Sequence, residues 1–159
     1  MTLKPKRVRD SCVELGQLVQ LSDTNPMGYI HGGVVMRMVD EAGAIAATKH
    51  AGRPAVTVAI DSMSFYSPVQ VGNLITFKAS LNYVGRTSME VGIRVEAEDL
   101  LTGEIIHTST AYCVYVALGI DGKPAPVPPL VPETDDEKRR WEAGKRRQEL
   151  RLQERHSEQ

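Results

Sequence analysis

Hydrophobic and polar positions alternate along most of the chain, which indicates β-strands. Alternation sends successive side chains to opposite faces, as in a sheet with one buried face. Short connections rich in turn-forming residues join the last four alternating runs, so we expect antiparallel hairpins between neighbours. The pattern occurs in five runs: 10–22 with an irregularity at Gly16, then 55–65, 74–84, 88–99 and 104–118.

Residues 34–50 do not alternate and instead predict one helix, with Gly52 as its stop signal. Before the last turn its charged side chains are only Arg37, Asp40 and Glu41, so nearly the whole circumference is apolar. A helix of this kind has to be buried rather than laid on a surface. The order of strand, helix and four strands therefore predicts an α+β fold, in which one antiparallel sheet wraps around a long central helix.

Charge and proline content divide the chain into four segments. Residues 1–10 form an arm with four basic side chains and one acidic side chain, and residues 11–120 contain the predicted sheet and helix. Residues 121–133 hold five of the nine prolines and predict an extended linker. Residues 134–159 carry charged side chains of both signs and predict a separate helix at the C-terminus.

The start of this last helix is marked by Thr134 and Glu137, which have the spacing of a capping box. Trp141 is the only tryptophan of the chain, and we expect it to dock the helix. The prolines of the linker fix φ and extend the chain. We expect the linker to run over the sheet and to deliver the helix to a neighbouring chain.

Overall composition is typical of a soluble globular protein, with 42% hydrophobic and 25% charged residues. The longest uncharged apolar run, 111–120, is about half of the ~20 residues that span a bilayer. The basic N-terminus has no apolar stretch behind it, which argues against a secretory signal. We expect a soluble cytoplasmic protein with no membrane partner.

Charge and cysteine content exclude further classes of partner. The net charge is −1, and no segment is basic enough to indicate nucleic-acid binding. Cys12 and Cys113 are far apart in the chain, and neither has a second ligand at metal-binding spacing. We therefore expect two small buried hydrophobic residues, with no metal site and no disulfide framework.

Four motifs resemble the hotdog-fold acyl-CoA thioesterases of the cytosolic acyl-CoA hydrolase type. The longest is Tyr-Ile-His-Gly-Gly-Val-Val-Met-Arg-Met-Val-Asp-Glu-Ala-Gly over residues 29–43. The others are residues 56–61 before Phe65, Gly-Arg-Thr-Ser-Met-Glu-Val at 85–91, and 127–134 leading into the charged helix. The resemblance spans residues 12–150. It implies hydrolysis of acyl-CoA to a carboxylic acid and CoA, without metal or redox cofactor.

The start of the long helix is suited to this chemistry. Gly32 and Gly33 leave backbone N–H groups uncovered at the positive end of the helix dipole. Such donors can stabilise a thioester carbonyl that becomes negative under attack, although glycines there also suit a close-packed turn. Asp40, two turns further along the same face, is the expected general base or nucleophile. A structural ion pair with Arg37 is the alternative for this carboxylate.

Two loop residues complete the catalytic set that the resemblance implies. Asn25 matches the second catalytic position and is expected to face Asp40 of a partner chain across a dimer interface. An ordinary loop asparagine before Pro26 is the alternative. His31 either bonds the substrate or holds the turn. Because a lone hotdog sheet leaves one edge and half of the site open, we expect a homodimer, and the family implies trimers of such dimers.

The resemblance also assigns the contacts with CoA. Backbone groups of Thr57, Val58 and Ala59 are expected to pair with the pantetheine arm, and the hairpin Arg86–Thr87–Ser88 is expected to meet its phosphates. Arg146 in the charged helix is a further phosphate contact. Both Arg86 and Arg146 could instead be ordinary solvated side chains.

Two other functions remain open at this point. Hotdog enoyl-CoA hydratases carry Asp-x-Asn-Pro-x-His, and here Asp23, Asn25 and Pro26 are present but Gly28 replaces the histidine. This loss weighs against hydration of a double bond. A non-catalytic acyl-CoA sensor would carry a separate DNA-binding helical module, for which we expect no room in 159 residues.

Overall fold

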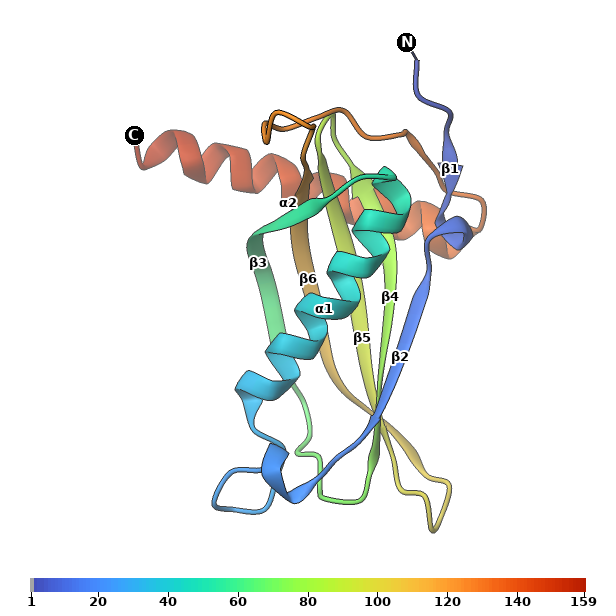
Figure 1. Cartoon of the computed structure of the whole chain (residues 1–159), viewed down its shortest axis with the longest axis vertical. Coiled ribbons are helices and arrows are strands. Elements are labelled where there is room, and N and C mark those ends of the chain that lie inside the picture. Colours follow the sequence, from blue (N-terminus) through green and yellow to red (C-terminus); the bar gives the residue numbers. More distant parts are fainter. Residues whose placement is uncertain (1) are drawn as a thin grey trace.

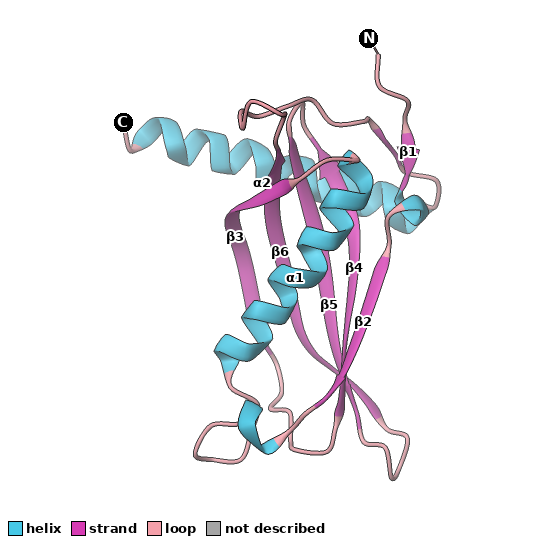
Figure 2. Ribbon diagram, in the orientation of Figure 1, coloured by secondary structure: helices cyan, strands magenta, loops and turns pink. Residues whose placement is uncertain are grey.

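A computed structural model describes residues 2–159 and contains one five-stranded antiparallel sheet, shown in Figures 1 and 2. The strand order is β2–β4–β5–β6–β3, so β2 and β3 are the two edges. The fold is the hotdog fold. The strands are β2 Val13–Leu18, β3 Ala55–Phe65, β4 Leu74–Val84, β5 Ser88–Glu98 and β6 Ile105–Ala117.

The long helix α1, Gly32–Ala51, lies across one face of this sheet (Figure 1). Its inward residues, such as Val39 and Ala46, are fully buried against sheet residues that include Phe77. The expectation of burial on nearly all sides was wrong for a single chain. Met36 and Ile45 are 42% and 41% exposed on the outer face, because one curved sheet covers only one side of a helix.

The C-terminal helix α2, Asp135–Ser157, lies behind the sheet in Figure 1, and its last turns project past β3. Thr134 and Glu137 form the predicted capping box. Trp141 docks the helix through an edge-to-face contact with Tyr83, with ring centres 5.1 Å apart. The helix therefore rests on the sheet of its own chain, where the sequence suggested a neighbouring chain.

The linker runs extended between β6 and α2 along one end of the sheet (Figure 2). Its main chain bonds to the hairpin and to β6, with Val127 N–H donating to Arg86 O and Ala125 N–H donating to Ala117 O. Further along, β7, Leu130–Val131, pairs in parallel with β1, Lys6–Arg7. Two short 3-10 helices, Val8–Asp10 and Leu21–Asp23, flank β2.

The predicted strand bounds agree with the structure for β3 and β4 and differ by one residue at the ends of β5 and β6. The first strand is shorter than predicted, and Gly16 pairs regularly with Thr76. The irregularities lie in β3 instead. Its register against β6 shifts between Thr57 and Ala59 and again between Ile60 and Ser62. Such bulges are common beside active sites.

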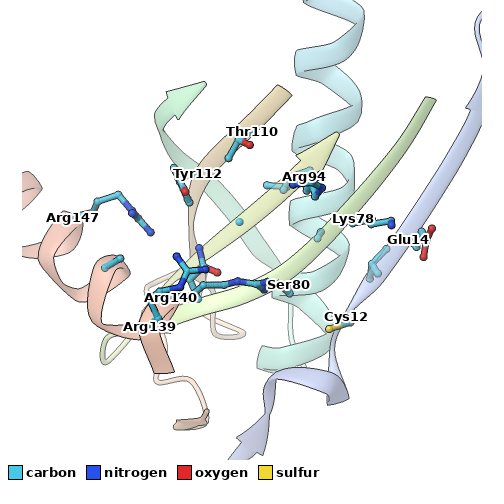
Figure 3. A pocket seen from close by; sticks show the side chains of 16 residues that line it. Cys12, Glu14, Lys78, Ser80, Arg94, Thr110, Tyr112, Arg139, Arg140 and Arg147 are labelled. Atoms are coloured by element: carbon cyan, nitrogen blue, oxygen red, sulfur yellow. The ribbon is translucent and has the colours of Figure 1, made fainter. Parts of the chain in front are cut away.

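One of the two cysteines departs from the expectation. Cys113 is buried in β6, but Cys12 is exposed. Cys12 precedes β2 and lines a groove of about 630 Å³ on the face of the sheet opposite α1, which Figure 3 shows. Only part of that face is covered by α2. No helix within residues 2–159 has the length and hydrophobicity needed to cross a membrane.

Candidate active site

The carboxylate of Asp40 is held by two hydroxyl groups from the sheet. Thr57 Oγ1 donates to Asp40 Oδ1 at 2.7 Å, and the Tyr115 hydroxyl lies 3.2 Å from the same oxygen. Within residues 2–159, Oδ2 accepts no hydrogen bond from the protein. One carboxylate oxygen is therefore fixed, and the other is free to accept a proton from water.

Arg37 does not pair with Asp40, which was the structural alternative for this carboxylate. The guanidinium of Arg37 lies 3.5 Å from Glu41 Oε1, one turn along the exposed side of α1. Glu41 takes the surface ion pair, and Asp40 faces the sheet.

Two groups beside Asp40 are kept neutral by burial. Burial raises the pKa of the Tyr115 phenol far above its ordinary value, so that Tyr115 is a hydrogen-bond donor at any working pH. Burial also raises the pKa of the Cys113 thiol to about 11, which leaves it protonated near pH 7. Tyr115 and Cys113 are therefore not available as bases or nucleophiles, which leaves the carboxylate of Asp40 as the candidate in this group of three side chains.

The start of α1 is capped by the side chain of His31. Its Nδ1 accepts a hydrogen bond from Gly33 N–H at 3.2 Å, which requires that this nitrogen carry no proton. The ring therefore holds the turn, as one of the two sequence interpretations proposed. Gly33 N–H is occupied by this cap. Among the described residues, Gly32 N–H has no acceptor and is the free donor at the helix start.

Asn25 shapes the loop that precedes α1. Its Oδ1 accepts hydrogen bonds from Met27 N–H at 3.0 Å and from Tyr29 N–H at 3.3 Å. Its side-chain amide Nδ2 has no protein partner within residues 2–159. Asn25 and Gly32 line one hollow of about 340 Å³. Asn25 therefore holds the loop through Oδ1 and still has a side-chain donor, Nδ2, that could bind another group.

Asn25 and Asp40 do not meet within one chain. Asp40 is absent from the hollow that Asn25 lines. From Gly33 to Asp40 the helix rises about 10 Å at 1.5 Å per residue. Val35, Phe65 and Tyr66 also line the hollow at the start of α1, which is therefore largely apolar.

The loop also bears on the hydratase alternative. The Asp23 carboxylate accepts from Gln20 N–H at 2.9 Å and from the Gln17 side chain at 3.3 Å, so it serves the loop. Gly28 has φ +83°, a left-handed conformation that residues other than glycine adopt uncommonly. The pair of catalytic side chains that a hydratase needs is not assembled here.

The residues expected to bind CoA lie at one end of the sheet. Thr57, Val58 and Ala59 are on the edge strand β3, and Val58 is 47% exposed at the first bulge. Ser88 begins β5, opposite Val116 of β6, which in turn pairs with Val56. This register places the Thr57 segment and the Arg86–Ser88 hairpin at the same end.

The two arginines expected to meet phosphate are both exposed. Arg86 lies with Trp141 beside a hollow of about 380 Å³ formed with the linker. Arg146 lies on α2, which packs on the back of its own sheet. Sequence reasoning missed Tyr115, because a tyrosine at an inward position of a strand resembles any core residue.

Comparison with known proteins agrees with this fold. Residues 27–104 match the thioesterase superfamily. The cytosolic acyl coenzyme A thioester hydrolase of Rattus norvegicus is 37% identical over 146 residues, which cover 91% of this chain and 38% of the rat protein. A solved hexameric acyl-CoA thioesterase is 39% identical, with a TM-score of 0.92 and coverage of 96% of this chain and 97% of that one.

A third relative is an acyl-CoA hydrolase from Staphylococcus aureus, solved with butyryl coenzyme A, coenzyme A and coenzyme A disulfide. It is 33% identical, with a TM-score of 0.91, and the match covers 97% of this chain and 94% of that one. Solved variants of it replace an aspartate, an asparagine or a threonine by alanine. The chain therefore belongs to the thioesterase superfamily, among the hotdog-fold acyl-CoA thioester hydrolases.

Proposed function

We propose that the protein hydrolyses acyl-CoA at a site centred on Asp40. The observation that carries the proposal is the asymmetry of this carboxylate. Its Oδ1 is held by Thr57 and Tyr115, and its Oδ2 has no protein partner within residues 2–159. A carboxylate that is oriented on one side and free on the other can act on water or on a thioester.

Bond making and breaking balance without a further reactant. In the general-base route, Oδ2 of Asp40 takes a proton from water while the water oxygen attacks the thioester carbon. The C–S bond then breaks, and the thiolate of CoA takes up the proton. In the nucleophilic route, a carboxylate oxygen of Asp40 attacks the thioester carbon, the C–S bond breaks, and CoA leaves as its thiolate. Water then hydrolyses the mixed anhydride to the carboxylic acid and regenerates Asp40, and the thiolate takes up the proton that this step releases. Hydrolysis changes no oxidation state, so the proposal needs no redox cofactor, and it assigns no step to a metal.

The start of α1 supplies the donor for the carbonyl oxygen. Gly32 N–H is the free backbone donor at the positive end of the helix dipole. His31 keeps the turn in shape by capping Gly33 N–H, and we assign it no proton transfer. The hollow beside Gly32 is the proposed place for the start of the acyl chain.

A second copy of the chain completes the proposed site. Asn25 lies in the loop before α1 and lines the same hollow as Gly32, whereas Asp40 lies further along the helix. The amide of Asn25 and Gly32 N–H are therefore proposed to hold one carbonyl, which Asp40 of the partner subunit acts on. Support comes from the unpaired outer edge of β3 and from Val56, Val58 and Ile60 on that strand, which are 43%, 47% and 38% exposed. The solved hexameric relatives also support a homo-oligomer, and we propose a trimer of dimers.

The CoA part of the substrate is proposed to lie along the end of the sheet that carries Thr57 and Arg86. The S. aureus hydrolase binds butyryl coenzyme A and coenzyme A, which supports a CoA thioester as the substrate class. Its solved alanine variants concern the three residue types that meet in the proposed site: an aspartate, an asparagine and a threonine. The cytosolic relative supports a cytoplasmic location.

The test is release of free thiol from acyl-CoAs, from acetyl to palmitoyl, by wild type and by Asp40→Asn. The variant is expected to lose about 10²–10⁴-fold in kcat and to keep its fold, since an amide fills the same space. Glu41→Gln is the matched control, because it alters the neighbouring surface acid. Wild-type turnover by folded Asp40→Asn would remove Asp40 from the mechanism.

A further inference from the structure

The helix α2 is anchored to the back of the sheet by a buried ion pair. Arg147 Nε lies 2.6 Å from Glu90 Oε1, and the side chain of Glu90 is fully buried. The guanidinium of Arg147 also lies 3.8 Å above the centre of the Tyr112 ring (Figure 3). These contacts fix the position of α2, and with it the next turn of the helix.

Gly144 allows this close approach. A Cβ atom at this position would lie 2.5 Å from Glu90 Oε2 and 2.9 Å from Tyr83 Cβ. Contacts this short do not occur between real Cβ atoms and their neighbours, so a larger residue would lift the helix. The distance between α2 and the sheet is thus set by packing, and the reach of the following side chains is limited accordingly.

Arg151, one turn beyond Arg147, connects α2 to the edge strand β3. Its Nη1 lies 2.9 Å from Asp61 Oδ2, and the two side chains are only 14% and 20% exposed. Within residues 2–159, no other ion pair or side-chain hydrogen bond joins α2 to β3. A pair shielded to this degree is screened less by salt than a surface pair.

Asp61 occupies the weakest part of β3. It lies at the second register shift, between Ile60 and Ser62, where the ladder with β6 is interrupted. A bulge leaves the extra residue unpaired and disrupts the local ladder. Within residues 2–159, β6 is the only strand that pairs with β3, so an interrupted ladder has no second strand to compensate for it. The ion pair with Arg151 therefore adds a side-chain contact at a point where the pairing of β3 with β6 is interrupted.

The same segment carries the threonine that orients Asp40. Thr57 lies directly before the first register shift, four residues from Asp61. Its hydroxyl reaches Asp40 Oδ1 at 2.7 Å. Bulges set the direction in which nearby side chains leave the strand, and a hydrogen bond weakens steeply outside its narrow range of distance and angle. A movement of the bulged segment would therefore weaken the hydrogen bond that orients the carboxylate of Asp40.

We infer that Arg151 is a positioning residue for the hydrolysis. Its ion pair with Asp61 holds the bulged part of β3 in place, so that Thr57 keeps the carboxylate of Asp40 oriented. The inference rests on the proposed function, since Arg151 acts through Asp40. It makes α2 part of the framework of the active site, in addition to its role in covering the back of the sheet.

The test is a double-mutant cycle between Arg151→Gln and Thr57→Ala, measured by thiol release under conditions where every variant is folded. Arg151→Gln is expected to lower kcat about 10-fold and to leave KM within 2-fold. In the Thr57→Ala background it is expected to change kcat less than about 2-fold, because the group through which it acts is already missing. Arg151→Lys, which keeps the charge, is expected to restore most of kcat.

Arg155→Gln is the matched control on the same helix, since Arg155 is exposed and is expected to leave kcat unchanged. If Arg151→Gln reduces the folded fraction, the same cycle is run with Asp61→Asn, which conserves shape. A kcat loss that is equally large with and without Thr57 would overturn the inference. So would a wild-type kcat for Arg151→Gln or Asp61→Asn.

Failure of the inference is distinguishable from failure of the proposed function. Asp40→Asn is measured alongside the cycle. If it is inactive while the Arg151 variants are normal, the site stands and only the positioning role is lost. If it is fully active, the proposed function itself fails, and the behaviour of Arg151 must have another origin.

Discussion

The hydroxyl of Tyr115 lies 3.0 Å from the main-chain oxygen of Asp40 and 3.2 Å from its carboxylate Oδ1. One buried phenol from β6 thus contacts both parts of the same residue on α1. Gly43 makes this possible, because a Cβ there would lie 2.2 Å from the Tyr115 oxygen. The close packing of Tyr115 against α1 therefore explains why a glycine stands at position 43 of the helix motif.

Tyr115→Phe tests the value of this contact. The variant keeps the ring and removes the donor, so the fold should survive with a loss of about 1–2 kcal/mol in the free energy of unfolding. We expect kcat to fall about 3- to 10-fold with KM unchanged, since Asp40 keeps the bond from Thr57. Tyr112→Phe, on the opposite face of the same strand, is the control for thiol-release kinetics. An unchanged kcat for Tyr115→Phe would make the hydroxyl purely structural.

Mixing two inactive variants tests the site shared between chains. Asn25→Ala and Asp40→Asn are each expected to be inactive as homo-oligomers. Subunits that are mixed, dissociated and re-associated should form some heterodimers in which one of the two sites is intact. We expect up to about one quarter of wild-type activity to return if exchange is random. No recovery, with mixed oligomers demonstrated by mass spectrometry, would contradict a shared site.

Arg146 tests the proposed contact with the phosphates of CoA. Arg146→Gln is expected to raise KM for acyl-CoA about 2- to 5-fold, an effect that high salt should reduce, because the side chain is exposed. KM for the matching acyl-pantetheine, which lacks the nucleotide phosphates, should not change. Lys138→Gln, on the same helix, is the control. An equal change with both substrates would assign Arg146 to assembly or stability.

We expect His50 to lower the free energy of unfolding of the protein in acid. Its Nε2 donates to Pro128 O at 2.8 Å, and its buried Nδ1 has no protein partner among residues 2–159. Burial is the main cause that lowers the pKa of His50 below 6.5, and the bond to Pro128 only partly opposes it. The unfolded chain therefore binds the proton more readily, and stability should fall as the pH drops below about 6.5, by at most about 1.4 kcal/mol per pH unit.

The measurement is denaturant unfolding of wild type and His50→Gln from pH 7.5 to pH 5. Glutamine can still donate to Pro128 but does not titrate, so the variant should show a flatter pH dependence than wild type. His156→Gln, at the exposed end of α2, should follow the wild-type curve. Parallel curves for wild type and His50→Gln would show that His50 does not cause the acid sensitivity.

Local patterns explain why much of the fold was predictable. The alternation in 55–65 and 74–84 specifies strands at those bounds, because the side-chain period of a strand is a property of neighbouring residues. The capping box of Thr134 and the pair of Arg37 with Glu41 likewise join residues three or four positions apart. Such contacts depend on local geometry, which the sequence order already contains.

The partners of Asp40 could not be predicted in this way. Thr57 and Tyr115 are 17 and 75 residues away, and nothing in their own segments marks them as ligands of a carboxylate. The bulges of β3 were also not predicted. An extra residue in a strand leaves the alternation of hydrophobic and polar side chains intact on either side of it. The resemblance supplied the site residues, but their hydrogen bonds follow from how the sheet places its strands against α1.

The sequence by itself determined the order of elements, most of their bounds and the location of the candidate chemistry at the start and middle of one helix. Only the tertiary structure decided that α2 covers its own sheet. That choice depends on the pair of Glu90 with Arg147 and on the missing side chain at Gly144. Contacts between residues far apart in the chain form only when the sheet and the helices pack together. They therefore leave no periodic pattern in the sequence from which they could be predicted.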